Sequence, residues 1–379
     1  MKRIDTGLNL RSNKLAISGD FRLRARVAST TSGHPYSTSH QETTRARVRL
    51  DYDVNEYAHA VVEFNFSEVW AGAEPYSDAF PTAGANGIAS RQSFNGLAQA
   101  YVQTEDLLGF EEKLRIGRST YFLANGLILG SCDFLQYPAT FTGAWLSRKF
   151  AGHDVEVFML DNYGPLQSQL AGGGERYFGA TGRLNFCESG PVQTLNAYYL
   201  AGTNSGDFKG RGEDWWYGLE GTGTIPGGVE WAAQFGHREV SGGKDVSAYR
   251  FSFTKKLDVP VLRSVAFTRT DSEGALHINP ADFNAAGLLH QYAGPWRSDL
   301  DTNQLAIALM PGGGVDLKFT VLTLDHRGPN GAGINRQLGE LEFDLLAAKE
   351  LRPGVHLSLG YGIDNDQRQV GYLQMSVFF

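Results

Sequence analysis

Strict alternation of apolar and polar side chains over long stretches is the feature that most constrains this sequence. In residues 15–27, LAISGDFRLRARV, apolar or small side chains fill the odd positions, and Asp20, Arg22, Arg24 and Arg26 fill even ones. Residues 44–54, TRARVRLDYDV, repeat the pattern with three further arginines. A period of two indicates a β-strand with one apolar face. Thirteen residues exceed the length of a typical soluble strand.

Stretches of this kind recur along the 379 residues. They are 15–27, 44–54, 57–66, 94–105, 113–120, 140–149, 154–162, 176–186, 192–201, 214–223, 229–238, 246–255, 262–270, 302–310, 315–325, 337–347, 354–361 and 370–379. Their connections alternate between short turns, such as PGGG at 311–314, and longer loops, such as 271–301. The series predicts an all-β fold of eighteen antiparallel strands, with sixteen as the alternative. No linker interrupts it, so we expect a single domain over residues 1–379.

Alternation alone does not say which face is wet. A soluble propeller or sandwich would bury the apolar face and expose the arginines. The strands, however, have the length of tilted membrane strands, and the alternating loop lengths are typical of outer-membrane barrels. A closed barrel of this size is too wide to fill with side chains, so its interior must be polar. We therefore predict a transmembrane, up-and-down β-barrel. No apolar run of about 18 residues, as a membrane helix needs, is present.

The C-terminal sequence, VGYLQMSVFF, alternates to its last residue. It predicts the closing strand, paired with residues 354–361 and 15–27, with Leu373, Met375, Val377 and Phe379 facing lipid. The N-terminus lacks the apolar core of a secretory signal, so we expect a mature chain with a methionine added, or else a protein that stays inside the cell. Aromatic residues near strand ends predict interfacial girdles: Tyr57, Phe66, Tyr121, Phe150, Tyr163, Phe186, Trp215 and Trp216.

Polar positions of the predicted strands would line a channel. The residues predicted to do so are Arg22, Arg24, Arg26, Arg45, Arg47, Arg49, Arg115, Arg183, Arg238, Arg250, Lys318, Asp51, Glu63, Glu340 and Glu342. In one register of the strand pair the first six form two facing ladders, although the sequence does not fix that register. Such ladders need compensation, because like charges opposite one another are destabilising. Arginine stays charged and fits carboxylates, so the pattern predicts a preference for anions. The acidic residues of the same parity leave open a neutralised, unselective wall.

Other functions lack their signatures. The net charge of −7 does not favour nucleic-acid binding. Cys132 and Cys187 have no CxxC partner, and we expect them at opposite ends of the barrel without a disulfide. No metal or cofactor site is predicted. An outer-membrane enzyme would need a nucleophile–base set near one rim, and no G-x-S-x-G or His–Asp cluster is present. An adhesin would have longer, more repetitive loops.

Two resemblances sharpen this interpretation. The pattern Leu373, Met375, Val377, Phe379 resembles the terminal-phenylalanine signature of bacterial outer-membrane proteins, which implies recognition by the barrel assembly machinery. Residues 114–150 resemble alginate-export-type porins, in which a Gly-Arg closes one strand, a Gly-rich piece enters a loop and an F-x-G-A motif opens the next strand. The matching positions are Gly117, Arg118, Gly126, Leu127, Ile128, Gly130, Phe141, Gly143 and Ala144. This resemblance implies eighteen strands and an acidic polysaccharide as solute.

The sequence thus predicts a passive outer-membrane channel for hydrophilic solutes that favours anionic ones, such as acidic (uronate) oligo- or polysaccharides. The alternative is a non-specific diffusion porin with mixed charge on its inner face. Its partners would be membrane lipid, the solute and the assembly machinery, without nucleic acid, and we favour a monomer. The loop at 121–139, with ANGLILG, is unusually apolar. We expect it to fold into the barrel and narrow it, the alternative being that it packs on the rim.

Overall fold

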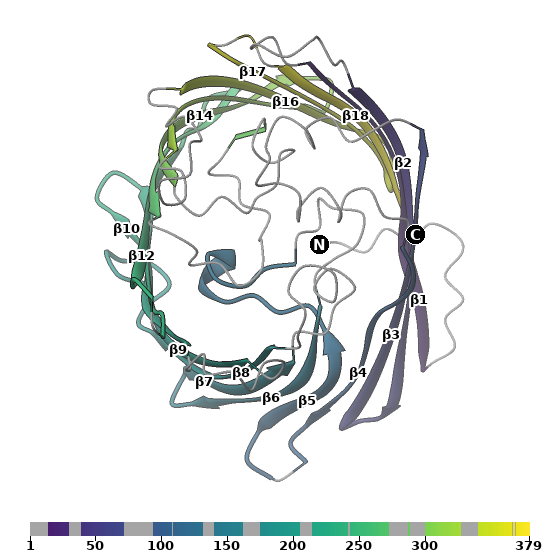
Figure 1. Cartoon of the computed structure of the whole chain (residues 1–379), viewed down its shortest axis with the longest axis vertical. Helices are drawn as coiled ribbons and strands as arrows, with labels where there is room; N and C mark the ends of the chain where they lie inside the picture. The colour runs from purple at the N-terminus through teal and green to yellow at the C-terminus, as the bar shows by residue number, and fades with distance from the viewer. Residues whose placement is uncertain are drawn as a thin grey trace.

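The computed structural model of the chain is a closed ring of strands (Figure 1). It describes residues 14–29, 39–71, 94–107, 109–131, 140–161, 175–204, 214–241, 243–272, 287–288, 300–326, 340–365, 367 and 369–379. Within these residues, eighteen strands form one sheet in which each strand pairs antiparallel with its chain neighbours and β1 pairs with β18. The fold is an eighteen-stranded up-and-down β-barrel, as the alternation predicts.

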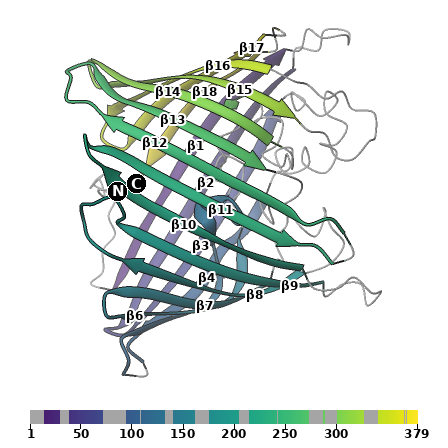
Figure 2. The same ribbon diagram turned by 90° about the vertical axis from the view of Figure 1, so that its left-hand side faces the viewer.

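Every predicted segment corresponds to one strand of the barrel. The strands are β1 (Leu15–Ser29), β2 (Ser39–Asn55), β3 (Ala58–Ala71), β4 (Phe94–Glu105), β5 (Glu112–Ser119), β6 (Phe141–Phe150), β7 (His153–Asp161), β8 (Glu175–Asn185), β9 (Thr194–Asn204), β10 (Asp214–Ile225), β11 (Val229–Glu239), β12 (Val246–Lys256), β13 (Leu262–Ser272), β14 (Leu300–Gly312), β15 (Val315–His326), β16 (Glu340–Arg352), β17 (Val355–Asp364) and β18 (Gln369–Phe378). Figure 2 shows their common tilt across the barrel. Among the described residues, no helix is long and apolar enough to cross a membrane.

The last residue closes the barrel. Gly19 and Phe379 exchange two backbone hydrogen bonds, of 2.9 and 3.1 Å, and a side chain on Gly19 would collide with the Phe379 ring. The predicted partners of the C-terminal strand are therefore correct, since β18 pairs with β17 and β1. Its two faces differ as expected: Leu373 is 50% exposed on the outside and Val370 is 1% exposed inside.

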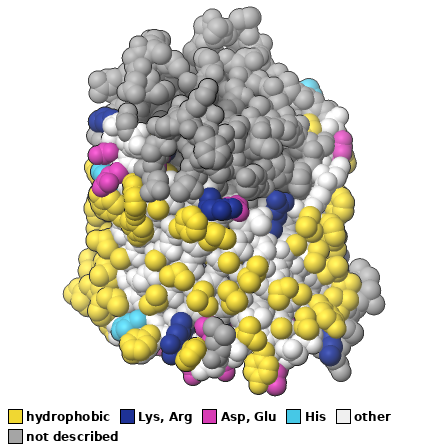
Figure 3. All heavy atoms as spheres, turned by 60° about the horizontal axis from the view of Figure 1, so that its bottom comes forward, with side chains coloured by type: hydrophobic (Ala, Val, Ile, Leu, Met, Phe, Trp, Pro, Cys, Tyr) yellow, Lys and Arg dark blue, Asp and Glu magenta, His cyan; other side chains and the backbone are white. Residues whose placement is uncertain are grey.

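The outer face carries an apolar belt. Alternate strand residues such as Phe64, Leu219 and Phe251 are exposed, and Figure 3 shows hydrophobic side chains over the strands, with charged groups at the edges. Aromatic side chains at strand ends join this surface at Tyr57, Phe66, Phe150, Phe186 and Trp215, all exposed. Tyr163 lies outside the described residues.

The girdle assignment is wrong for two aromatics. Trp216 and Tyr121 are buried inside the barrel, in a cluster with Phe141, Phe158 and other apolar side chains. On one side of the barrel the inner face is therefore apolar, contrary to the expectation of a uniformly polar interior. The physical reason is that part of the loop between β5 and β6 covers this wall, so its side chains do not meet water.

The backbone geometry at Gly117 of β5 requires a glycine. Its φ of +132° lies in the region that favours glycine, and a Cβ there would lie 2.2 Å from the carbonyl oxygen of Ala100. Arg118, next in the sequence, points to the outer face and donates to Thr142 Oγ1 at 3.3 Å. The Gly-Arg pair thus lies just before the last residue of β5, where the backbone closely approaches β4.

Candidate functional site in the barrel interior

Six arginines of β1 and β2 form one column on the inner face, named here the arginine column. Arg22 lies directly opposite Arg45, whereas Arg47 lies opposite Asp20. The two rows overlap at one rung only, so they do not form the two facing ladders expected from the sequence. From Ser18, opposite Arg49, to Arg26 the column extends about 27 Å along an extended strand. Within it, Arg22, Arg24, Arg26 and Arg45 are buried.

Carboxylates hold the half of the column near the short turns. Asp20 accepts a hydrogen bond from Arg47 Nε at 2.5 Å and another from Arg45 Nη2 at 3.3 Å. Arg49 forks onto Asp51, with Nε and Nη2 each 3.0 Å from a carboxylate oxygen. The predicted compensation of the arginines by protein carboxylates is therefore present at these positions.

Neutral groups bond two arginines of the half near the long loops. Arg24 Nε donates to Gln374 Oε1 of β18 at 2.8 Å, and its guanidinium lies 5.9 Å from the centre of the Tyr372 ring. Arg26 donates to the amide oxygen of Gln41. Amide and aromatic partners orient a guanidinium without cancelling its charge. These two partners thus orient guanidinium groups in this half and add no negative charge of their own.

Tyr101 of β4 connects the arginine column to a further arginine, Arg115 of β5. Arg49 Nη2 donates to its hydroxyl at 3.2 Å, and the Arg115 guanidinium lies 4.8 Å from its ring centre. Arg115 also donates to Gln103 Oε1 at 3.0 Å. Glu63 lies 3.8 Å from Arg49 and is buried. Two of the predicted lining residues therefore lie beside this surface: Glu63 on β3, next to the column, and Arg115 on β5, linked to it through Tyr101.

The remaining predicted cations lie on other parts of the inner face. Arg238 of β11 donates to Asp214 at 2.5 Å. Arg183 of β8 is exposed and lines an internal cavity. Arg250 and Lys318 are half-buried on β12 and β15. These four are not brought together with the arginine column.

Two carboxylates of β16 lie under a loop segment. Glu342 and Asp344 are buried, and the backbone N–H of Leu288 donates to Asp344 Oδ2 at 3.2 Å. A Cβ on Gly287, which has φ of +72°, would lie 2.6 Å from the Glu342 carboxylate. Residues 287–288 therefore reach the inner wall. The side chain of Glu340 lies outside the described part of the chain.

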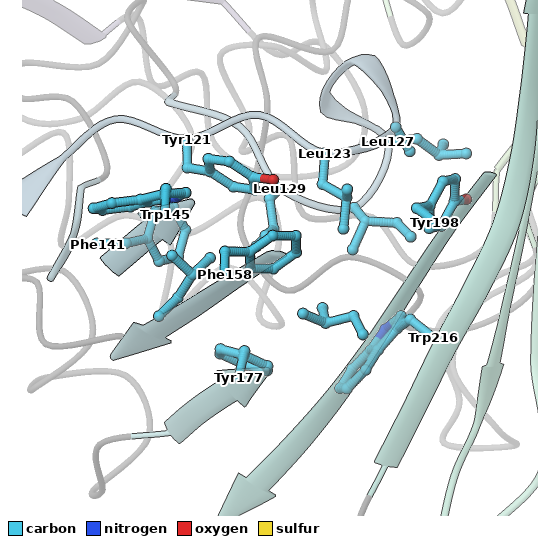
Figure 4. Close-up of a cluster of buried hydrophobic side chains, with 14 of the residues drawn as sticks. Tyr121, Leu123, Leu127, Leu129, Phe141, Trp145, Phe158, Tyr177, Tyr198 and Trp216 are labelled. Atoms are coloured by element: carbon cyan, nitrogen blue, oxygen red, sulfur yellow. The ribbon is translucent and has the colours of Figure 1, made fainter. Parts of the chain in front are cut away.

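The apolar loop folds inward, as the sequence predicts. A short 3₁₀ turn, η2 (Ala124–Gly126), lies inside the ring in Figure 1, and Leu123, Leu127 and Leu129 are buried against the wall (Figure 4). The wall side chains come from β6 to β10 and from β12: Phe141, Trp145, Phe158, Leu160, Tyr177, Tyr198, Leu200, Trp216 and Ala248. The described part of this loop, residues 120–131, is called the inner loop below.

Tyr121 anchors the inner loop. Its ring centre lies 4.8 Å from that of Phe158 and 6.0 Å from that of Trp145. Its hydroxyl donates to Glu156 Oε1 at 2.5 Å. Burial, together with the negative charge of Glu156, raises the pKa of the Tyr121 hydroxyl, so it remains a donor at neutral pH. Since β1 and β10 are nine strands apart in the ring, the loop covers the wall opposite the arginine column.

A cavity of about 860 Å³ lies beside the inner loop, toward the short turns. Phe122 and Asn125 of the loop line it, as do residues of β8 to β11 and of the turns after β4 and β6. Sequence reasoning missed this cavity, because its residues come together only through the register of four strands.

Among the described residues, no group of three or more His, Cys, Asp or Glu side chains is arranged to hold a metal ion. Cys187 is a free, exposed thiol, and Cys132 lies outside the described residues.

The fold and the interior define a class: the chain has the fold of eighteen-stranded bacterial outer-membrane porins. No protein-family model matches the sequence, and no curated protein matches it. Several solved structures, in contrast, are similar to it in fold. OccK2 (OpdF) of Pseudomonas aeruginosa in complex with glucuronate has a TM-score of 0.66 at 14% identity, over 97% of this chain and 98% of that chain.

Two further structures agree with this result. A BenF-like porin from Pseudomonas fluorescens Pf-5 has a TM-score of 0.68 at 11% identity, over 97% of this chain and 98% of that chain. OpdQ of Pseudomonas aeruginosa has a TM-score of 0.66 at 14% identity, over 96% and 98%. These likenesses establish the fold. They do not single out the alginate-export type that residues 114–150 resemble.

Proposed function

We propose that the protein is an outer-membrane channel for passive diffusion of hydrophilic solutes, with a preference for anionic ones such as acidic uronate oligo- or polysaccharides. The observation that carries this proposal is the arginine column. Successive arginines on one strand lie about 7 Å apart, so a carboxylate leaving one guanidinium meets the next. Several weak sites in series favour conduction over capture.

The chemistry of arginine supports this solute class. A guanidinium presents a planar fork of donors that matches a carboxylate and keeps its charge at any physiological pH. In the half of the column near the long loops, the described partners Gln374 and Gln41 are neutral. A solute with one carboxylate per sugar would add charge-assisted hydrogen bonds there.

Two independent likenesses point the same way. The OccK2 (OpdF) structure is a complex with glucuronate, a single uronate sugar. The resemblance of residues 114–150 to alginate-export porins implies a polymer of uronates. Both concern other proteins, and they support the proposal only by the class of solute that they share.

A second candidate is a non-specific diffusion porin. Its support is the mixed charge of the inner face, where Asp20, Asp51 and Glu63 adjoin the column and Glu342 and Asp344 occupy β16. Such a wall would conduct small ions of either sign. In either case we place the protein in the outer membrane as a monomeric channel, assembled through its C-terminal strand. We propose neither an enzymatic activity nor a nucleic-acid partner.

The reversal potential of the channel in a planar bilayer under a KCl gradient tests the proposal. The wild type is expected to pass chloride in preference to potassium. Replacing Arg22, Arg24, Arg47 and Arg49 together by Gln is expected to reduce or reverse that preference. If cations carry the wild-type current, the anionic-solute proposal fails and the non-specific porin replaces it.

Arg118→Gln combined with Arg176→Gln is the matched control. Both side chains are on the outer face, where Arg118 bonds Thr142 and Arg176 pairs with Asp161 at 2.6 Å. This double variant removes positive charge from the protein without touching the interior. Its reversal potential is expected to equal that of the wild type.

A further inference from the structure

A row of polar side chains crosses four strands on the wall opposite the arginine column. In register from β8 to β11 they are Arg183, Asn196, Glu220 and Gln234. All four line the cavity beside the inner loop. This set is called the polar row. It contains a guanidinium, two amides and a carboxylate, and nothing in the proposed anion pathway uses it.

Hydrogen bonds within the polar row fix its geometry. Asn196 Nδ2 donates to Glu220 Oε2 at 2.7 Å, and Gln234 Nε2 donates to Glu220 Oε1 at 3.1 Å. Each oxygen of the carboxylate is therefore held by an amide from a different neighbouring strand. A site whose groups are held in place before binding loses less entropy when a ligand arrives.

One acceptor in the row has no partner. Gln234 is 7% exposed, and its Oε1 has no hydrogen-bond partner in the described part of the chain. Its amide nitrogen is committed to Glu220, so the oxygen is turned away from the carboxylate. A buried acceptor left unsatisfied costs free energy. A ligand with a hydroxyl donor in the cavity would remove that cost.

Hydroxyls and an aromatic ring complete the surroundings. Thr194 and Thr222, on the side of the row nearer the short turns, share a hydrogen bond of 2.7 Å and also line the cavity. From the inner loop, Phe122 lines the same cavity and is 57% exposed. A large aromatic side chain exposed beside polar groups offers a flat surface to the apolar face of a ligand.

We propose that the polar row is a binding site for the hydroxyl groups of a sugar, with Phe122 against the C–H face of the ring. Each sugar hydroxyl both donates and accepts, and the row alternates acceptors and donors at the spacing of neighbouring strands, about 4.8 Å. Glu220 does not make this a cation site, because both its oxygens already accept from amides and Arg183 lies in the same row. The site depends on the proposed channel function but not on anion preference.

Residence of a neutral trisaccharide, maltotriose, in single channels tests this proposal. Maltotriose added on the side of the short turns is expected to interrupt the current transiently. Gln234→Leu removes the unsatisfied acceptor and one bond to Glu220, and it is expected to shorten the interruptions about five- to tenfold. Phe122→Ala, a change in the loop and not in the wall, is expected to shorten them as well.

Gln304→Leu is the matched control. Gln304 is an equally buried glutamine on the inner face of β14, outside the cavity. Its variant is expected to keep wild-type interruptions. Equal residence times in the Gln234 and Gln304 variants, or no interruption of the wild type by maltotriose, would overturn the proposal.

The two proposals fail in different ways. Gln234→Leu exchanges one neutral side chain for another, so its reversal potential under a KCl gradient is expected to stay at the wild-type value. A cation-selective channel that still holds maltotriose through Gln234 would refute anion preference and retain the sugar site. An anion-selective channel indifferent to maltotriose would do the reverse.

Discussion

Arg22 lies directly opposite Arg45 across the β1–β2 pair, and both side chains are buried in the barrel wall. Like charges in this arrangement repel one another. Asp20, two residues before Arg22 on the same face, accepts hydrogen bonds from Arg45 and Arg47. Arg45 and Arg47 therefore share the Asp20 carboxylate beside this like-charged pair, and the contribution of that carboxylate can be measured.

Asp20→Asn is expected to destabilise the folded barrel by roughly 3 kcal/mol, because the buried Arg45 and its neighbour Arg47 lose the carboxylate that they share. It is also expected to increase anion preference, since the interior loses a negative charge. Urea unfolding in lipid vesicles and the reversal potential measure the two effects. Asp161→Asn, which breaks an exposed pair with Arg176 on the outer face, is the control and should cost less than about 1 kcal/mol. Equal losses in both variants would contradict this role of Asp20.

The strand map could be predicted because a period of two is a local signal that each segment carries by itself. The register of β1 against β2 could not, because shifting one strand by a residue changes every cross-strand pair. That is why two facing ladders were expected where one column exists. The polar row was missed for the same reason, since Asn196, Glu220 and Gln234 are far apart in the sequence and meet only through pairing.

The inward fold of the inner loop could be predicted from its composition. Its composition around ANGLILG is too apolar for a rim exposed to water, and it does fold inward. The wall that receives it also carries a signal, because residues 154–162 include Phe158 and Leu160 on the face that the alternation assigns to the interior. An apolar inner face therefore marks where a loop packs. Trp216 was misassigned because its position near a strand end outweighed its parity.

Leu129→Asp is expected to release the inner loop and raise single-channel conductance. Leu129 is fully buried against the wall, and an unpaired buried carboxylate there would cost several kcal/mol. Asn125→Asp adds the same charge at an exposed position of the same loop and is expected to leave conductance near the wild-type value. A folded Leu129→Asp barrel with wild-type conductance would show that the loop does not constrict the channel.

Gly117→Ala is expected to destabilise the barrel by roughly 2 kcal/mol or more, because it combines an unfavourable φ with a collision against the Ala100 carbonyl. Gly152→Ala separates the two effects. Gly152 has φ of +83° in the turn after β6, and a Cβ there would meet nothing within 4 Å. Its expected cost is about 1 kcal/mol, from the backbone alone. Comparison of the two urea midpoints gives the contribution of the close approach, and similar midpoints would mean that β5 can shift to make room.

Phe379→Ala is expected to slow assembly more than it lowers the stability of the finished barrel. The backbone bonds between Gly19 and Phe379 survive the substitution, whereas the ring over Gly19 is lost. Leu373→Ala, at an outer-face position in the middle of β18, removes a side chain that is more exposed and does not touch the seam with Gly19. Folding rates into vesicles with and without purified assembly machinery separate the two roles of the terminal ring. A defect of Phe379→Ala that appears only with the machinery indicates recognition, and a defect in both kinds of vesicle indicates that the ring helps β18 to find β1. If the two variants fold at the same rate in each kind of vesicle, the terminal aromatic has neither role.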